Sequence, residues 1–211
     1  MPMSEFQRSR LRDGREYRNL AAPMAAQEGG GRIAEGYATV FNQPYELYSE
    51  GDYRVMEEVD RRAFDECDMT DVIFQYDHQG RVFARTRNNT LTVRPDERGL
   101  YIAADLGGTE GGRELYEEIR LGYIDRMSFG FIVSEDEIVV TEDPITGAVT
   151  VLRRILKIRK LYDVSAVSIP ANDMTSISAR SQGSGILSGL AQQRSREARN
   201  RLHLRLLLEG I

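Results

Sequence analysis

The sequence has little of what builds a disulfide-bonded, metal-binding or membrane-spanning protein. Its 211 residues include one cysteine, Cys67, and two histidines. A single cysteine excludes an intramolecular disulfide and a cysteine-rich zinc site, and no HExxH pattern is present. No apolar run approaches the roughly 20 residues that a spanning helix needs, and we expect no secretory signal. We therefore expect a soluble, cytosolic protein with no metal and no other cofactor.

Several catalytic patterns are also missing. There is no GxSxG motif, which argues against an α/β-hydrolase. The 33 acidic residues make any glycosidase-type carboxylate pair uninformative. Cys67 stands between Glu66 and Asp68, whose charges disfavour a thiolate, so we interpret this cysteine as structural.

Charge is distributed unevenly along the chain. Residues 1–32 hold six basic and four acidic side chains, and residues 180–211 hold six and two. The intervening residues 33–179 hold 16 and 27, so an acidic body lies between basic ends. Such ends bind nucleic acid, bind an acidic protein surface, or are simply solvated. Without an interleaved aromatic platform, nucleic acid is not an expected partner.

Composition divides the chain into three parts. Residues 1–31 form a polar, Arg-rich arm, predicted to be flexible, that ends in three glycines and has one short strand near residues 17–20. Residues 32–180 form the predicted domain. Residues 181–211 begin with a Gly/Ser-rich linker at 181–188 and continue as a basic, amphipathic C-terminal helix.

The body is predicted to be mainly β. Alternating β-formers and turn residues predict strands at 32–41, 53–59, 71–78, 91–94 and 100–106, and a hairpin of 137–141 with 149–161 that continues to 169. A helix is predicted at 109–120, from the N-cap Thr109 to a stop at Gly122, and a short one after Asp60. Many short strands and few helices favour a barrel or a sandwich.

The stretch Asp125 to Phe131 contains the first candidate nucleophile. Large apolar side chains alternate there, which places Ser128 and Gly130 together on the opposite face of a strand. We expect Gly130 to leave open space beside the hydroxyl, as a peptide substrate would need. The alternative is an ordinary strand with one polar position facing water.

His78 and Asp163 are the other candidates. His78 is the only histidine in the body and is expected at a strand end in line with large apolar groups. It is either a hydrogen-bonded core histidine or a general base. Asp163 shares a strand face with Ser165, where a carboxylate is costly to bury unless a partner faces it. A nucleophilic serine needs a base and an orienting acid, but spacing alone leaves open whether the three residues meet.

Several ordered motifs resemble the caudovirus prohead protease family, the serine proteases that mature phage capsids. They cover about residues 32–180 and together are quite specific: GYATVFN at 36–42, Asp77-His78 followed by Arg85 and Leu91, DERGL at 96–100, the run from Gly122 to RMSFGF at 126–131, and DVSAV at 163–167 followed by PAN at 170–172.

This resemblance implies a fold similar to the herpesvirus assembly proteases, a β-barrel with surrounding helices. It implies Ser128 as nucleophile, His78 as general base and Asp163 as the acid that orients His78. The family usually has Asn-His-Asp where this chain has Asp77-His78-Gln79, and more often Glu at position 163. Herpesvirus relatives use a second histidine as third member, but His203 lies in the tail, which argues for the carboxylate. Arg85 is either a residue that positions an oxyanion-side water or a surface arginine.

The resemblance also implies partners and a location. The substrate is expected to be the major capsid protein or a scaffold protein, cleaved inside the viral procapsid in the host cytoplasm. The linker at 181–188 suggests that the enzyme also removes its own C-terminal segment, and assembly proteases of this type suggest a homodimer. The alternative is an inactive capsid-assembly or scaffold-binding protein that keeps the barrel, an interpretation favoured by the departure around His78.

Overall fold

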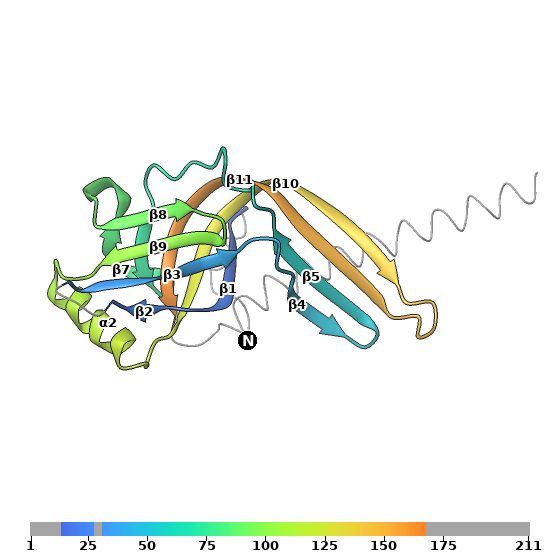
Figure 1. Cartoon of the computed structure of the whole chain (residues 1–211), viewed down its shortest axis with the longest axis horizontal. Helices are drawn as coiled ribbons and strands as arrows, with labels where there is room; N and C mark the ends of the chain where they lie inside the picture. The colour runs from blue at the N-terminus through green and yellow to red at the C-terminus, as the bar shows by residue number, and fades with distance from the viewer. Residues whose placement is uncertain (1–13, 28–30, 168–211) are drawn as a thin grey trace, which may run out of the picture.

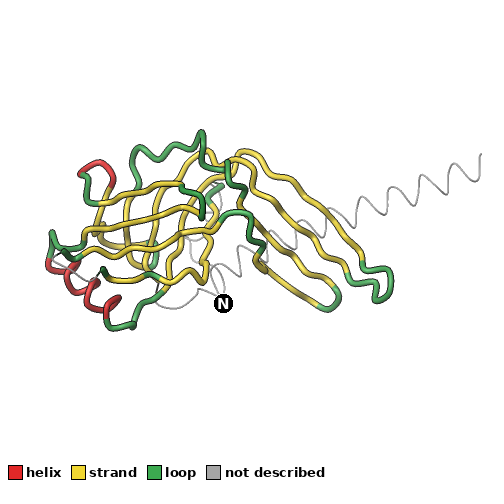
Figure 2. Tube along the Cα trace, viewed as in Figure 1, coloured by secondary structure: helices red, strands yellow, loops and turns green. Residues whose placement is uncertain are grey.

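The computed structural model describes residues 14–27 and 31–167. Over these ranges the protein is mainly β, with eleven strands and one α-helix arranged as two sheets. Helical segments lie at one end of the molecule, and the opposite end consists of strands and turns (Figure 2). The prediction of a mainly β fold is therefore confirmed.

The larger sheet is built around two long neighbouring strands. Its order is β1 (Glu16–Pro23), β10 (Arg126–Glu142), β11 (Val149–Val167), β5 (Tyr53–Val59) and β4 (Tyr45–Glu50), with β6 (Ile73–Tyr76) paired to β11 and β7 (Gln79–Arg85) paired to β6. The first part of β11 pairs with β5 and its last part with β6. The distal halves of β10 and β11 extend beyond the body together with β4 and β5, as an arm (Figure 1).

The smaller sheet has the order β2 (Ala25–Ala26), β3 (Ile33–Val40), β9 (Gly99–Asp105) and β8 (Leu91–Pro95). The chain passes from β1 in the larger sheet to β2 through Met24, whose N–H donates to the Asp125 carbonyl at 3.0 Å. One hydrophobic cluster includes buried residues of both sheets, among them Phe74, Phe129 and Ile102. The two sheets therefore share a core.

The pairing of these strands does not form a closed barrel. Within the part of the chain that the structure describes, no hydrogen-bonded ladder joins the two sheets. The β-rich class predicted from the sequence is thus correct, but the herpesvirus-protease-like barrel is not confirmed.

The helix α2 (Glu110–Arg120) forms as its sequence predicts. The Thr109 hydroxyl accepts a hydrogen bond from the Gly112 N–H at 3.0 Å, as an N-cap does. Leu115 and Ile119 are buried, and the chain leaves the helix through Gly122, whose φ of 78° suits glycine. The helix packs beside β2 and β3 (Figure 1).

Two local predictions were wrong. Turns replace the short helix predicted after Asp60: backbone bonds there join residues three apart, as where the Ala63 N–H donates to the Asp60 carbonyl at 3.0 Å. The strand predicted at 71–78 ends at Tyr76, and β7 follows after a two-residue turn. The strands β2, β4 and β7 and the 3₁₀ turn η1 (Thr86–Asn88) had no prediction.

The segment assigned to an N-terminal arm contributes to the fold. Residues 16–23 form β1 of the larger sheet and residues 25–26 form β2. The domain boundaries at 31 and 180 stay predictions, and the linker and helix predicted at 181–211 lie outside the described residues. Within the described ranges, no helix is both long and apolar enough to cross a bilayer.

Candidate active site

Three side chains from distant parts of the sequence form one hydrogen-bonded row. The Nε2 atom of His78 lies 2.5 Å from the Ser128 hydroxyl oxygen, and its Nδ1 atom hydrogen-bonds to Oδ2 of Asp163. All three are buried, with 7% of His78, 0% of Ser128 and 3% of Asp163 exposed. The structure thus brings together the three residues that the sequence analysis selected, with the imidazole in the middle.

The register of β10 and β11 places the serine and the carboxylate on one face. In this antiparallel pair Ser128 lies opposite Ser165, and Gly130 lies opposite Asp163. Directly opposed residues share a face of the sheet, and residues two apart on one strand also share it. These four positions therefore form a square on one face, with apolar side chains such as Val164 on the other.

His78 reaches this square from a turn, not from a strand. Tyr76 pairs with Gln79, and between them Asp77 and His78 have φ values of 47° and 57°, which is typical of a type I′ hairpin turn. Because β6 runs parallel to β11, the turn lies beside the end of β11, where the Asp77 N–H donates to the Ala166 carbonyl at 3.0 Å. The expected alignment of His78 with the apolar strand residues was wrong.

Two consecutive left-handed residues without glycine are costly for a backbone. Such conformations persist when the surrounding structure holds them in place, and they concentrate at functional sites. Here the bond from Asp77 to β11 and the two bonds of the His78 ring hold the turn.

Gly130 does not leave open space beside Ser128, which corrects the sequence-based expectation. A Cβ atom at this position would lie less than 3.0 Å from the Asp163 carboxylate and 2.6 Å from Cε1 of Tyr17. The missing side chain makes room for the acid and the tyrosine, not for a substrate.

Sequence reasoning missed Tyr17 as part of this environment. Its ring packs edge-on against the His78 imidazole, with ring centroids 4.5 Å apart at 67°. Tyr17 lies on β1 opposite Gly130, so the pairing of β1 with β10 brings it there. The β-forming run near residues 17–20 was recognised, but nothing local in it indicates the strand with which it pairs.

Ser165 was noted only as a neighbour of Asp163 along the strand. Its hydroxyl donates to Asp163 Oδ2 at 3.2 Å, and the residue is fully buried. The same carboxylate oxygen hydrogen-bonds to the imidazole. Asp163 therefore has two buried partners, which satisfies the condition for burying a carboxylate there.

The sequence matches a family of known proteins. Residues 21–185 match the caudovirus prohead serine protease family. The chain belongs to that family. The prohead protease of Enterobacteria phage HK97 is 27% identical over 161 residues, which cover 75% of this chain and 64% of that protein. The chain thus spans less than two thirds of the length of this curated relative, and no solved structure matches it.

The family match begins after Tyr17, at residue 21. Most of β1 therefore precedes the matched region, although it borders the candidate serine. Beside Tyr17 on this strand, Arg18 is 1% exposed and forms ion pairs with Glu57 at 2.5 Å and Glu16 at 2.6 Å. Arg153 also pairs with both acids, at 2.9 and 2.7 Å, so these four residues form a buried ion cluster.

The ion cluster keeps Arg18 charged. Burial lowers the pKa of its guanidinium, but the charge and hydrogen bonds of Glu57 and the charge of Glu16 outweigh burial and raise the pKa above its ordinary value. Because Glu57 lies on β5 and Arg153 on β11, the cluster ties β1 across the larger sheet. Tyr17 is thereby held near His78.

Arg85 forms an ion pair with Asp71. Its guanidinium forms two hydrogen bonds of 2.6 Å with the Asp71 carboxylate, and 40% of its side chain is exposed. This favours the alternative interpretation, a surface arginine in an ion pair.

Cys67 is the one cysteine of the chain, and it is not suited to act as a nucleophile. Cys67 is partly buried, and burial raises the pKa of its thiol to about 12, which disfavours a thiolate. Among residues 14–27 and 31–167, no cluster of three or more histidine, cysteine or acidic side chains could hold a metal ion.

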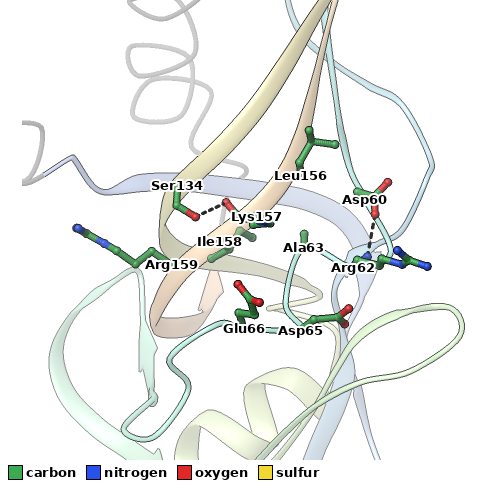
Figure 3. Close-up of a pocket in the computed structure, with 10 residues that line it drawn as sticks. All are labelled: Asp60, Arg62, Ala63, Asp65, Glu66, Ser134, Leu156, Lys157, Ile158 and Arg159. Carbon is green, nitrogen blue, oxygen red and sulfur yellow. Dashed lines mark hydrogen bonds between the residues drawn. The ribbon is translucent and has the colours of Figure 1, made fainter.

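A hollow between residues 60–66 and the middle of β11 contains none of the three candidate residues (Figure 3). Acidic Asp65 and Glu66 and basic Lys157 and Arg159 line it, and Ser134 there donates to the Lys157 carbonyl at 3.2 Å. With mixed charge and no described nucleophile–base pair, it does not compete with Ser128 as a catalytic site.

Proposed function

We propose that this chain is a serine endopeptidase that cleaves capsid or scaffold protein during maturation of a phage prohead. The observation that carries the proposal is the buried row Ser128–His78–Asp163, in which one imidazole contacts a hydroxyl on one side and a carboxylate on the other. Membership of the prohead serine protease family supplies the substrate class.

The row suits acyl transfer. Nε2 of His78 takes the hydroxyl proton of Ser128 while Oγ attacks the scissile carbonyl carbon, and backbone N–H groups stabilise the oxyanion. Protonated His78 then gives its proton to the leaving amine, and water releases the acyl group with His78 again as base. Asp163 accepts the Nδ1–H and stabilises the imidazolium. Because Ser128 has no exposed surface, a substrate needs a local opening of the chain around it.

Further parts of the proposal rest on the family resemblance. We propose that the enzyme acts inside the procapsid in the host cell, as a homodimer, and that it cleaves itself within the segment after residue 180. An intact C-terminus, found by mass spectrometry on active enzyme incorporated in capsids, would count against self-removal.

We also retain the herpesvirus-protease-like barrel as a proposal. Its support is the direct passage of the chain from β1 to β2, which joins the two sheets at one corner around a common core. In this structure an isolated bridge between Phe41 and Val59 links the two sheets. An experimental structure of the whole chain in which no continuous ladder of hydrogen bonds joins them would reject the barrel.

The test is co-expression with the capsid or scaffold protein encoded beside this gene. Wild type, Ser128→Ala and Ser134→Ala are compared by intact mass of the partner. Ser134 is a matched control because it lies on the same strand but is exposed and outside the row. We expect cleavage by wild type and Ser134→Ala only.

Cleavage by Ser128→Ala would refute the serine as nucleophile. No cleavage by any variant, even in assembled procapsids, would favour the alternative of an inactive assembly protein. The unusual residues on either side of His78 are what favours this alternative.

A further inference from the structure

Ser165 is a buried hydroxyl beside the carboxylate that the proposed mechanism needs, yet the mechanism assigns it no role. It is fully buried, and its Oγ donates to Oδ2 of Asp163 at 3.2 Å. The oxygen it contacts is the same one that hydrogen-bonds to Nδ1 of His78. Two donors therefore converge on one oxygen of this carboxylate.

We propose that Ser165 is a positioning residue that fixes the Asp163 carboxylate in the orientation that receives His78 Nδ1–H. This inference rests on the proposed function and names a further residue for it. The terminal torsion of an aspartate has broad minima, so packing or hydrogen bonds must select its orientation. The hydroxyl supplies one such bond, and the imidazole can then supply the second without reorienting the acid.

The strand register explains why position 165 has this role. Asp163 and Ser165 are two residues apart on β11 and share the face that also carries Ser128. A hydroxyl one carbon from the backbone reaches back along that face to the carboxylate.

Gly130 and Ser165 act on different sides of the same group. The absent side chain at Gly130 gives Oδ1 its space, and the hydroxyl of Ser165 holds Oδ2. Oδ2 of the carboxylate is thus held by a hydrogen bond, and Oδ1 occupies the space that a side chain at position 130 would fill. This arrangement favours the tautomer of His78 that carries its proton on Nδ1 and leaves Nε2 free to accept from Ser128.

The effect of removing Ser165 distinguishes a structural role from a positioning role. If the Ser165 hydroxyl only fills space and pairs with a neighbour, Ser165→Ala should slow the reaction by the same factor whichever residue stands at position 163. If it acts through the carboxylate, its effect should vanish once the carboxylate is gone. A double-mutant cycle measures this difference.

The cycle uses wild type, Ser165→Ala, Asp163→Asn and the double variant, in the full chain. Its readout is the rate at which a fluorophosphonate probe labels the protein, followed by intact mass, with Ser128→Ala as the blank. We expect Ser165→Ala to slow labelling about tenfold, the scale of one hydrogen bond to a charged group. With Asn at position 163, we expect Ser165→Ala to slow labelling by less than about twofold.

A second readout does not require activity. The chain has only two histidines, so ¹⁵N-histidine spectra of wild type and of a His203→Gln variant assign the His78 signals. We expect the Nδ1–H tautomer in wild type and an increased Nε2–H population in Ser165→Ala. Ser134→Ala serves as the control and should match wild type. If Ser165→Ala does not fold, Ser165→Cys, which fills the site but donates weakly, replaces it.

The outcomes separate this inference from the proposed function. Wild type that is labelled no faster than the Ser128→Ala blank would contradict the proposed function, and the tautomer spectra would still decide the role of Ser165. An equal loss in both backgrounds of the cycle, or an unchanged tautomer in Ser165→Ala, would overturn the positioning role.

Discussion

At the scale of single residues, the candidate site depends on a side chain that is absent. Gly130 has no Cβ where the Asp163 carboxylate and the Tyr17 ring come together, and both contacts would be closer than real Cβ atoms allow. From the sequence we expected the missing side chain of Gly130 to leave room for a substrate beside Ser128. The neighbours across the strands on either side decide what occupies it.

Gly130→Ala is expected to destabilise the protein by roughly 1–3 kcal/mol, as overpacking in a buried site does. It should also slow cleavage about 100-fold or more, because the carboxylate is displaced from His78. Urea unfolding and the capsid-cleavage assay measure the two effects. Gly108→Ala is the control, since nothing lies within 4 Å of a Cβ there. Full activity in Gly130→Ala would show that the carboxylate tolerates displacement.

Cys67 allows a prediction on pH dependence. Burial raises the pKa of its thiol to about 12, so at pH 8 the folded protein holds very little thiolate. We expect slow alkylation by iodoacetamide that accelerates as pH rises toward that value, and fast alkylation in urea, where the pKa returns to about 8.5. Intact mass over time measures both rates. Equal alkylation rates in the folded and unfolded states at pH 8 would contradict a raised pKa of the Cys67 thiol.

At the scale of elements, two of the strands that pair with β10 and β11 complete the site. On the β10 side, β1 carries Tyr17 to the imidazole. On the β11 side, β6 runs alongside and ends in the turn that carries His78. The buried ion cluster of Glu16, Arg18, Glu57 and Arg153 anchors β1 in this position.

Arg18→Met should destabilise the fold by about 3–5 kcal/mol, because it leaves Glu57 and Glu16 buried without their closest cation. Urea unfolding followed by far-UV circular dichroism measures the change. Arg54→Ala is the matched control: its ion pair with Glu46 is largely exposed and 3.2 Å long, and we expect a change of no more than about 0.5 kcal/mol. Similar values for both variants would refute a structural role for the cluster.

At the scale of the whole molecule, part of the N-terminal segment belongs to the folded body, because residues 16–23 form β1 of the larger sheet. A chain that begins at residue 24 lacks β1, and with it Tyr17 and Arg18. We expect it to lose capsid cleavage and much of its stability. A chain that begins at residue 14 keeps β1 and should cleave like wild type. Cleavage by the shorter chain would show that β1 is dispensable, and the two chains are compared by intact mass of the substrate.

The sequence alone determined the elements whose signals are local. The helix at 110–120 followed from an N-cap, a buried stripe and a glycine stop, and the β8–β9 hairpin from its turn residues. It also selected His78, Ser128 and Asp163, because one histidine in the body leaves few choices and the family motifs name the same three. Their catalytic roles stay proposals.

Only the tertiary structure decided how these parts meet. The partner of β1, the left-handed turn that carries His78 and the packing at Gly130 all depend on contacts between residues far apart in the chain or on the register of paired strands. The bond from Ser165 to Asp163 spans only two residues of β11, but only the folded structure shows that the two side chains meet. The turn at Asp77 and His78 could not be predicted from local sequence, because neither residue is glycine and only the surrounding contacts hold its left-handed backbone. Strand pairing depends on residues far apart in the sequence, and it is this pairing that brings His78, Ser128 and Asp163 together in one row.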